Sequence, residues 1–194
     1  MEKVIQPNRK GLIYPAILVL FIIIADQALK LWVRQHMFIG QEISVIGDWF
    51  LLHFTENNGI AFGLEFFGRN GKLGLTLFRI FAAGLIGYFA YLMHQKAQPR
   101  GLVIAISMIF AGAVGNIIDS IFYGVLFDYE QLFYGKVVDM LYFPLISFTF
   151  PDWMPFWAGH DFLFFRPVFN IADAAITTGV FMILLFYRKE INDL

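Results

Sequence analysis

The chain has 194 residues, a length that suits a single domain, but 59% of the residues are hydrophobic and only 15% are charged. That composition is too apolar for a soluble domain of this size, so we expect an integral membrane protein. Fourteen Lys and Arg residues against 15 Asp and Glu give a net charge of -1, which indicates no nucleic-acid partner. The absence of cysteine excludes disulfides, thiolate metal sites and a cysteine nucleophile.

Four long apolar stretches predict membrane-spanning helices. A hydrocarbon core of roughly 30 Å needs about 20 helical residues, and continuous apolarity favours helices over the alternation of a β-barrel. The first stretch is interpreted as a retained helix, because Asp26, Lys30 and Arg34 occupy the place of a signal-peptide cleavage site. We therefore expect one all-α membrane domain with four transmembrane helices, at about residues 12–33, 73–93, 102–121 and 168–187.

The two long connections differ in character. Residues 34–72 contain strand-like alternation at 42–45 and a β-rich run at 48–54, followed by the turn-prone Asn57, Asn58 and Gly59, so a small β element is predicted there. Residues 122–167 are rich in aromatic side chains and contain prolines that exclude a long helix. Such rings prefer the membrane–water interface, so this loop is expected to lie on the bilayer.

Basic residues predict the orientation. In a four-span arrangement, those that flank the spans fall on one side of the membrane, which the positive-inside rule makes cytoplasmic. Both termini should then face the cytoplasm, and the connections 34–72 and 122–167 should lie outside. The residues concerned are Lys3, Arg9, Lys10, Lys96, Arg100, Arg188 and Lys189.

Four acidic residues lie in or beside apolar segments: Asp26, Asp119, Asp139 and Asp173. A carboxylate beside lipid costs several kcal/mol unless it faces a partner or a polar cavity, so such acids are functional candidates. For each acid alone, a bond to a neighbouring helix or a helix cap is an equally good interpretation. Spacing supports a common site at the outer face, through the pairs Asp26 and Lys30, Asn116 and Asp119, and Asn170 and Asp173. The first pair could form an ion pair on one helix face, and a structural role is its favoured interpretation.

Paired carboxylates can share one proton, so that one activates water while the other protonates a carbonyl oxygen. This is the chemistry of aspartic proteases. The four histidines show no metal-ligand spacing, and no Gly-x-Ser-x-Gly motif marks a serine nucleophile. The alternative is a small transporter whose acids relay protons or ions, but such acids belong near the bilayer midplane, often within internal repeats. A noncatalytic scaffold would leave the Asp and Asn pairs unexplained.

Five motifs in order resemble the bacterial lipoprotein signal peptidases, also called type II signal peptidases. The resemblance implies a four-helix inner-membrane aspartic protease that cuts a prolipoprotein immediately before its diacylglyceryl-modified cysteine, without a metal or cofactor. It also implies contact with membrane lipid and inhibition by globomycin-type cyclic peptides. The motifs are Asp26-x-x-x-Lys30, Asn57-Asn58-Gly59-Ile60-Ala61-Phe62-Gly63, Gly115-Asn116-Ile117-Ile118-Asp119-Ser120, Val137-Val138-Asp139 and Phe169-Asn170-Ile171-Ala172-Asp173.

The resemblance also implies residue roles. Asp139 and Asp173 correspond to the family's catalytic pair. Asn57 matches the Asn of the second motif better than Asn58 and is the candidate for contacting substrate backbone. The remaining matches are expected to bind substrate or shape the site, and they are Asp26, Lys30, Gly59, Asn116, Asp119 and Asn170.

Two departures from the family pattern stand out. Family members commonly have Arg where this chain has Ser120, so Ser120→Arg is expected to be tolerated or to improve turnover. Arg166 is a candidate substitute for the missing Arg. Residues 143–167 form a longer connection than the family pattern leads us to expect. An interfacial anchor is the favoured interpretation of this segment, and a lid over the substrate is the alternative.

Overall fold

A computed structural model describes residues 12–59, 68–164 and 166–192. Lys3, Arg9 and Lys10, which entered the orientation argument, lie outside the described residues, as do motif residues 60–63. The chain divides into two compact units. We call residues 1–29, 57–137 and 171–194 the helical unit, and residues 30–56 and 138–170 the sheet unit.

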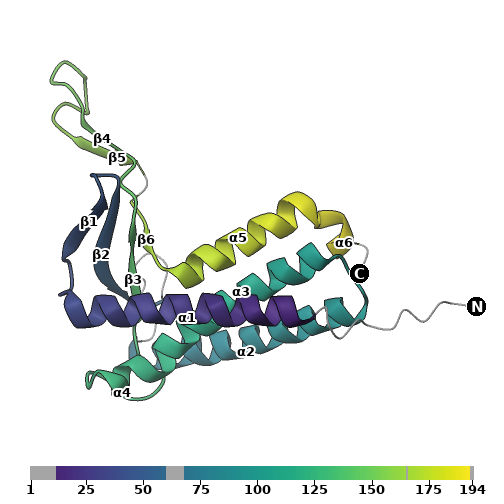
Figure 1. Ribbon diagram of the computed structural model, residues 1–194. Coiled ribbons are helices and arrows are strands. Elements are labelled where there is room, and N and C mark those ends of the chain that lie inside the picture. The colour runs from purple at the N-terminus through teal and green to yellow at the C-terminus, as the bar shows by residue number, and fades with distance from the viewer. Residues whose placement is uncertain (1–11, 60–67, 165, 193–194) are drawn as a thin grey trace, which may run out of the picture. The chain divides into compact units, whose positions relative to one another are not determined.

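Helix α3 (Arg100–Ile118) is the most buried part of the helical unit, and it packs against both α2 (Gly68–Gln95) and α5 (Ile171–Phe186), as Figure 1 shows. Small residues allow the close approach of α3 and α5. A Cβ added to Gly112 would overlap the Ala172 carbonyl oxygen, and one added to Gly179 would lie 2.7 Å from Ile109 Cγ1. Glycine contacts of this kind are typical of helix interfaces within membranes.

Among its described residues, the helical unit contains two apolar clusters. Met93, Leu102, Val103 and Ile106 are buried between α2 and α3, with Tyr187 packed against them. Nearer the other end of the helices, Ile22 of α1 (Ile13–His36) packs with residues of α3 and α5. The described part of the chain ends with the short helix α6 (Arg188–Asn192).

The third helix does not end as a regular α-helix. Residues Asp119–Tyr123 form a π-helical turn, followed by the short α4 (Gly124–Leu126). Two carbonyls of this turn accept hydrogen bonds from backbone amides of the loop that follows it. Gly135 donates to Ser120 at 2.9 Å, and Phe133 donates to Ile121 at 3.1 Å. π-Helical turns are rare and occur frequently at functional sites, which draws attention to Asp119 at the start of this one.

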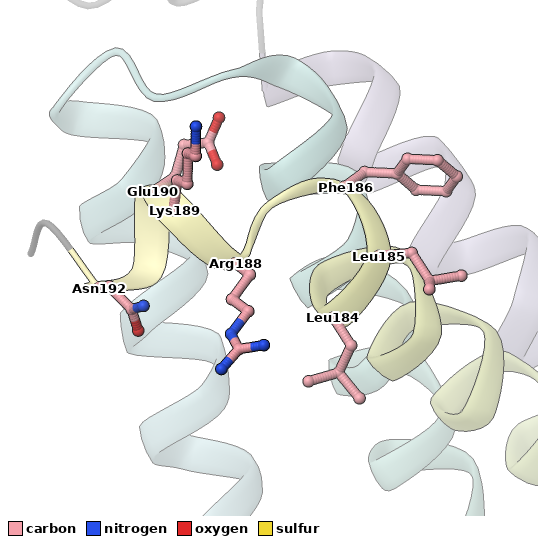
Figure 2. A pocket seen from close by; sticks show the side chains of 7 residues that line it. All are labelled: Leu184, Leu185, Phe186, Arg188, Lys189, Glu190 and Asn192. Carbon is pink, nitrogen blue, oxygen red and sulfur yellow. The ribbon is translucent and has the colours of Figure 1, made fainter.

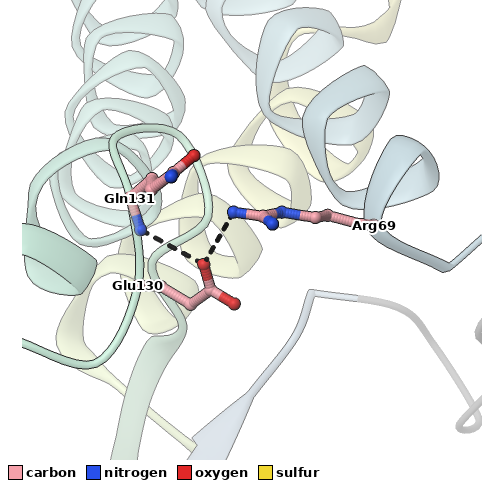
Figure 3. Close-up of polar contacts among 3 residues, drawn as sticks. All are labelled: Arg69, Glu130 and Gln131. Carbon is pink, nitrogen blue, oxygen red and sulfur yellow. Dashed lines mark hydrogen bonds and ion pairs between the residues drawn. The ribbon is translucent and has the colours of Figure 1, made fainter.

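An ion pair connects the start of α2 with the loop after α4 (Figure 3). Arg69 Nη2 lies 3.3 Å from Glu130 Oε2, which also accepts a hydrogen bond from the Gln131 backbone amide at 3.2 Å. The Arg69 guanidinium also lies 4.6 Å from the centroid of the Tyr134 ring. Both charged groups are exposed, so we expect the pair to contribute at most about 1 kcal/mol to stability.

Four strands in the order β1-β2-β3-β6 form the main sheet, which draws on both long connections. In the antiparallel β1–β2 pair, Glu42 stands opposite His53, and their side chains are 2.7 Å apart. Phe143 follows β3 and stacks on Phe50 at 4.7 Å and on Phe169 at 5.8 Å. The strands are β1 (Glu42–Ile46), β2 (Phe50–Asn57), β3 (Val137–Tyr142) and β6 (Val168–Phe169).

A separate antiparallel hairpin lies between β3 and β6 in the chain. It consists of β4 (Ile146–Thr149) and β5 (Asp161–Phe164). The loop at its tip exposes aromatic side chains, with Trp153 79% exposed and Phe156 96% exposed. Apolar rings with this exposure are unusual on a surface that faces only water.

The predicted spans correspond to helices, with differences at their ends. Within the part of the chain that the structure describes, three helices are long and apolar enough to cross a membrane, at Ile13–His36, Arg69–Gln95 and Arg100–Leu126. The helix that contains the span predicted at 102–121 is longer than that span, because the π-helical turn and α4 extend it to Leu126. The fourth, predicted at 168–187, was wrong at its start because Val168 and Phe169 pair with β3, and the apolar helix Ile171–Phe186 has 16 residues.

The predicted β element is confirmed, but all-α was too narrow a class for this helix-rich fold. Strand β3 from the second connection joins the strands of the first, and the 143–167 segment adds a second sheet. The loops are also shorter than predicted, since α1 continues to His36 and α2 begins at Gly68. The single-domain organisation stays a prediction.

Candidate functional site

Asp26 connects α1 with the first turn of α5. The carboxylate is 1% exposed, and its Oδ1 accepts a hydrogen bond from the Ala172 backbone amide at 2.9 Å. Amides in the first turn of a helix have no partner within that helix, so Asp26 caps α5 from a distant part of the chain. Its neighbour Gly115 is needed for this approach, because an added Cβ would lie 2.9 Å from Asp26 Oδ2. Asp26 therefore fixes the backbone immediately before Asp173.

Gln27 connects α1 with the end of α3. Its side-chain Nε2 lies 2.8 Å from Asp119 Oδ1, 3.1 Å from the Gly115 carbonyl oxygen and 3.2 Å from Asp26 Oδ2. Its Oε1 accepts a hydrogen bond from the buried Tyr123 hydroxyl at 3.1 Å. Asp119 is fully buried, and Gln27 gives its carboxylate a neutral donor.

Asp173 lies in the first turn of α5 and faces α3. Its Oδ1 accepts a hydrogen bond from Asn116 Nδ2 at 2.7 Å. The backbone of Asn116 is held as well, because its carbonyl oxygen accepts a hydrogen bond from the Ser120 hydroxyl at 2.9 Å. A carboxylate at a helix N-terminus is also stabilised by the helix dipole. Asn116 and Asp173, which the sequence spacing assigned to two different pairs, are thus joined across the facing helices α3 and α5.

In the sheet unit, Asp139 lies on β3 between two buried apolar residues and is 2% exposed. Its Oδ1 accepts a hydrogen bond from Asn170 Nδ2 at 2.7 Å, and the same nitrogen lies 3.3 Å from the Val138 carbonyl oxygen. Asn170 is fully buried and directly precedes α5 in the chain. The structure thus pairs Asp139 with an amide donor, as it pairs Asp173 with Asn116.

The turn at Asn57, Asn58 and Gly59 follows β2. The Asn57 side-chain oxygen accepts a hydrogen bond from the Gly59 backbone amide at 2.7 Å, and Gly59 has φ = +81°, a conformation that favours glycine. Lys72 of α2, which is buried, donates to the Asn58 carbonyl oxygen at 3.0 Å. Asn57 therefore shapes its own turn, and its predicted contact with substrate stays a prediction.

The structure brings the predicted residues together in two groups. In the helical unit, Asp26, Asn116, Asp119 and Asp173 meet around the ends of α3 and α5. In the sheet unit, Asp139 meets Asn170. Lys30 is fully buried on α1, four residues after Asp26, and an ion pair between the two stays a prediction.

Sequence reasoning missed three polar residues at the site: Gln27, Lys72 and Arg79. Arg79 Nη1 lies 3.0 Å from Ser120 Oγ, so the guanidinium at this hydroxyl comes from α2. Arg166, the substitute proposed from the sequence, is exposed, and its role stays a prediction. The sequence did contain a signal for Arg79, which is a cation within the apolar stretch 73–93. A charged residue within a predicted span indicates that a polar partner lies nearby.

A surface pocket lies elsewhere, at the junction of α5 and α6 (Figure 2). Its lining includes Leu184, Arg188 and Lys189 and none of the predicted site residues. Among residues 12–59, 68–164 and 166–192, no group of three or more His, Asp and Glu side chains could hold a metal ion. The polar groups that converge are carboxylates and their amide and cationic donors, which suit proton transfer and backbone binding.

Comparisons with known proteins point to one family. The family model described as signal peptidase (SPase) II matches residues 18–188. A lipoprotein signal peptidase of Porphyromonas gingivalis is 43% identical over 193 residues, covering 91% of this chain and 84% of the relative. Another from Amoebophilus asiaticus is 41% identical over 182 residues, covering 89% of this chain and 77% of the relative.

Two solved structures described as bacterial membrane enzymes are similar in fold. One has a TM-score of 0.63 and 30% identity, and covers 89% of this chain and 90% of that chain. The other has a TM-score of 0.62 and 25% identity, and covers 93% of this chain and 90% of that chain.

Proposed function

Because the chain belongs to the signal peptidase II family, we propose that Asp139 and Asp173 are the catalytic pair with which it cuts prolipoproteins immediately before the diacylglyceryl-modified cysteine. Signal-peptide removal by an aspartic endopeptidase is the activity of this family. The observation that carries the proposal is the family match, which extends from residue 18 to residue 188 and includes both acids. The transporter alternative finds no support among the similar proteins.

The proposed reaction needs two carboxylates that share one proton. Ionising both at short range is costly, so one remains protonated and donates to the scissile carbonyl while the other takes a proton from water. Low dielectric at a membrane interface favours this singly protonated state. The water oxygen attacks the carbonyl carbon as it loses this proton, which gives a tetrahedral intermediate. The carboxyl that took the proton from water then gives it to the leaving amine, the C–N bond breaks, and the other carboxylate takes back a proton from the intermediate's hydroxyl group.

The surroundings of the two acids support these roles. Each carboxylate accepts one amide hydrogen bond of 2.7 Å, from Asn170 to Asp139 and from Asn116 to Asp173. Neutral amide donors orient a carboxylate without the full charge that would fix it as an anion. Asn170 stands three residues before Asp173 in the sequence, so the donor of one acid and the other acid belong to one short segment.

The remaining predicted residues have proposed roles around this pair. Asn57 and Gly59 would contact substrate backbone from the turn after β2, and Asp119 would shape the site with Asn116. Asp26 would hold the start of α5, since it caps the Ala172 amide. Lys30 would provide a buried positive charge on α1. No metal or cofactor takes part in this proposal.

A membrane location fits the substrate. The diacylglyceryl group keeps the scissile bond at the bilayer surface, so a site at the outer interface lets the acyl chains stay in lipid. The exposed Trp153 and Phe156 of the β4–β5 hairpin support an interfacial position for residues 143–167, because aromatic rings favour that region. Globomycin-type cyclic peptides, which the family resemblance implies as inhibitors, would compete with substrate.

We further propose that α5 is a fourth span, with both termini in the cytoplasm of a bacterial inner membrane and the active site outside. Sixteen residues rise about 24 Å, short of a core of roughly 30 Å, so α5 needs flanking residues or local thinning to cross. The positive-inside rule supports the crossing, because Arg188 and Lys189 then face the cytoplasm.

Single cysteines introduced into this cysteine-free chain at Asp48, Gln98, Asp152 and Asn192 will test the topology. In intact cells with a permeable outer membrane, an impermeant thiol reagent should label positions 48 and 152 but neither 98 nor 192. Labelling at 192 with the other three results unchanged would show that α5 does not cross. Labelling at 98 but at neither 48 nor 152 would contradict the orientation. Denatured samples labelled in parallel control for expression.

The proposed activity can be tested with detergent-purified protein and a diacylglyceryl-modified precursor. We expect a gel shift that corresponds to loss of the signal peptide. The same precursor with its acceptor cysteine changed to serine, and therefore without lipid, is the matched control and should remain intact. Failure to cleave the lipidated precursor would refute the proposed function.

A further inference from the structure

Arg79 places a cation well inside a candidate membrane span. It lies ten residues after the start of the span Arg69–Gln95, about 15 Å along the helix axis. A charged residue at such depth is costly unless it reaches water or a polar partner. Long cationic side chains often extend toward the interface, but Arg79 donates hydrogen bonds to groups of the protein on two other segments. These contacts indicate a specific role within the fold.

The guanidinium of Arg79 joins two segments that are far apart in sequence. Nη1 donates to Ser120 Oγ at 3.0 Å, and Nη2 donates to the Gly59 carbonyl oxygen at 3.2 Å. Gly59 has no side chain to separate the two groups, since an added Cβ would lie 2.7 Å from Arg79 Cζ. The planar guanidinium therefore rests against the Gly59 backbone, and its fork of donors suits two acceptors at once.

Arg79 belongs to a polar stripe on α2 that also includes Lys72 and Thr76. The spacing of four and then three residues places all three on one helix face. Lys72 donates to the Asn58 carbonyl oxygen, and the Thr76 hydroxyl lies 2.9 Å from the Phe133 carbonyl oxygen. Two consecutive carbonyls of the turn, those of Asn58 and Gly59, are thus held by two cations from α2.

We propose that Arg79 is a positioning residue of this peptidase, which fixes the Gly59 carbonyl beside Ser120 and thereby holds the Asn57–Gly59 turn ready to bind substrate. The inference rests on the proposed function, in which that turn contacts the substrate backbone. It also changes the expectation for Ser120. An arginine introduced there would meet a guanidinium already in place, so Ser120→Arg alone should be harmful.

An exchange of the two side chains tests the inference. Arg79→Ser should raise KM for the lipidated precursor by about 10- to 100-fold, the range for losing hydrogen bonds to a charged group, with kcat changed less than about threefold. Ser120→Arg alone should also lower kcat/KM, because two guanidinium groups then compete for one site. The double variant Arg79→Ser/Ser120→Arg restores one guanidinium from α3 and should regain most of the lost activity.

Arg69→Ser is the matched control, because it removes an exposed arginine from the same helix and should leave kcat and KM unchanged. Thermal unfolding in detergent reports whether each variant keeps its fold. If the double variant does not fold, Arg79→Lys replaces it as the test. The single ammonium group of lysine should give a KM between those of the wild type and Arg79→Ser.

Three results would overturn the inference while wild-type cleavage continues. They are an unchanged kcat/KM in Arg79→Ser, a loss confined to kcat, and a folded double variant without recovery. Absence of cleavage by the wild-type protein would instead refute the proposed function itself.

Discussion

Asp139→Asn and Asp173→Asn should each lower kcat for cleavage of a lipidated precursor by at least about 1,000-fold, within the range that acid–base catalysis contributes. Asparagine keeps the size of aspartate and an oxygen that can accept the amide hydrogen bond from Asn170 or Asn116. It cannot exchange a proton near neutral pH. The variants should therefore fold and insert normally, and single-turnover assays with purified protein will measure the loss.

Two further variants make this test specific. The double variant Asp139→Asn/Asp173→Asn should be scarcely slower than either single variant. The two carboxylates act as a unit, so the first substitution already removes the catalysis to which both contribute. Asp26→Asn is the matched control and should mainly lower thermal stability, since it perturbs the contacts with Ala172 and Gln27. Near wild-type turnover in either catalytic variant would contradict the assignment, and Asp119 would become the next candidate.

Gly112→Ala should lower both stability and activity, because it adds one methyl group where α3 and α5 are closest. The new Cβ would overlap the Ala172 carbonyl oxygen and lie 2.7 Å from Ile176 Cγ1. Overpacking typically costs about 1–3 kcal/mol. A shift of α5 would move Asp173 away from Asn116, and misplacement by about 1 Å can cost about 100-fold in rate. Thermal unfolding and the cleavage assay will measure the two effects.

Gly84→Ala provides the control for the glycine substitution. Gly84 lies within α2, and an added Cβ there meets no atom within 4 Å. Alanine is a better helix former than glycine, so this variant should be as stable as the wild type or slightly more so. Equal stability and activity in the Gly112 and Gly84 variants would contradict the importance of the close α3–α5 contact.

Local sequence patterns predicted the helices well but not all of their ends. The length of an apolar stretch depends only on the sequence of that stretch and needs no knowledge of distant residues. Helices therefore appear near 12–33, 73–93 and 102–121 as expected. The fourth segment begins late because Val168 and Phe169 are as suited to a strand as to a helix. Their pairing with Tyr142 and Leu141 decides the outcome, and pairing depends on residues far away in sequence.

The acids of the candidate site could be found from sequence because a carboxylate in an apolar run needs an explanation. Their partners were harder to find. Gln27 is uncharged and stands beside the more conspicuous Asp26, and its role depends on Asp119, 92 residues away. Arg79 stands out in the sequence as a charge within an apolar stretch, but only the fold brings it to Ser120 and Gly59. Spacing along one helix cannot predict such contacts between distant segments.

The most direct test of the central claim is mass spectrometry of the products formed from a diacylglyceryl-modified precursor by the purified wild-type protein. We predict a single cut, which leaves the modified cysteine as the new N-terminal residue, and no product from the unmodified precursor. No cleavage, cleavage at another bond, or equal cleavage of both precursors would contradict the account.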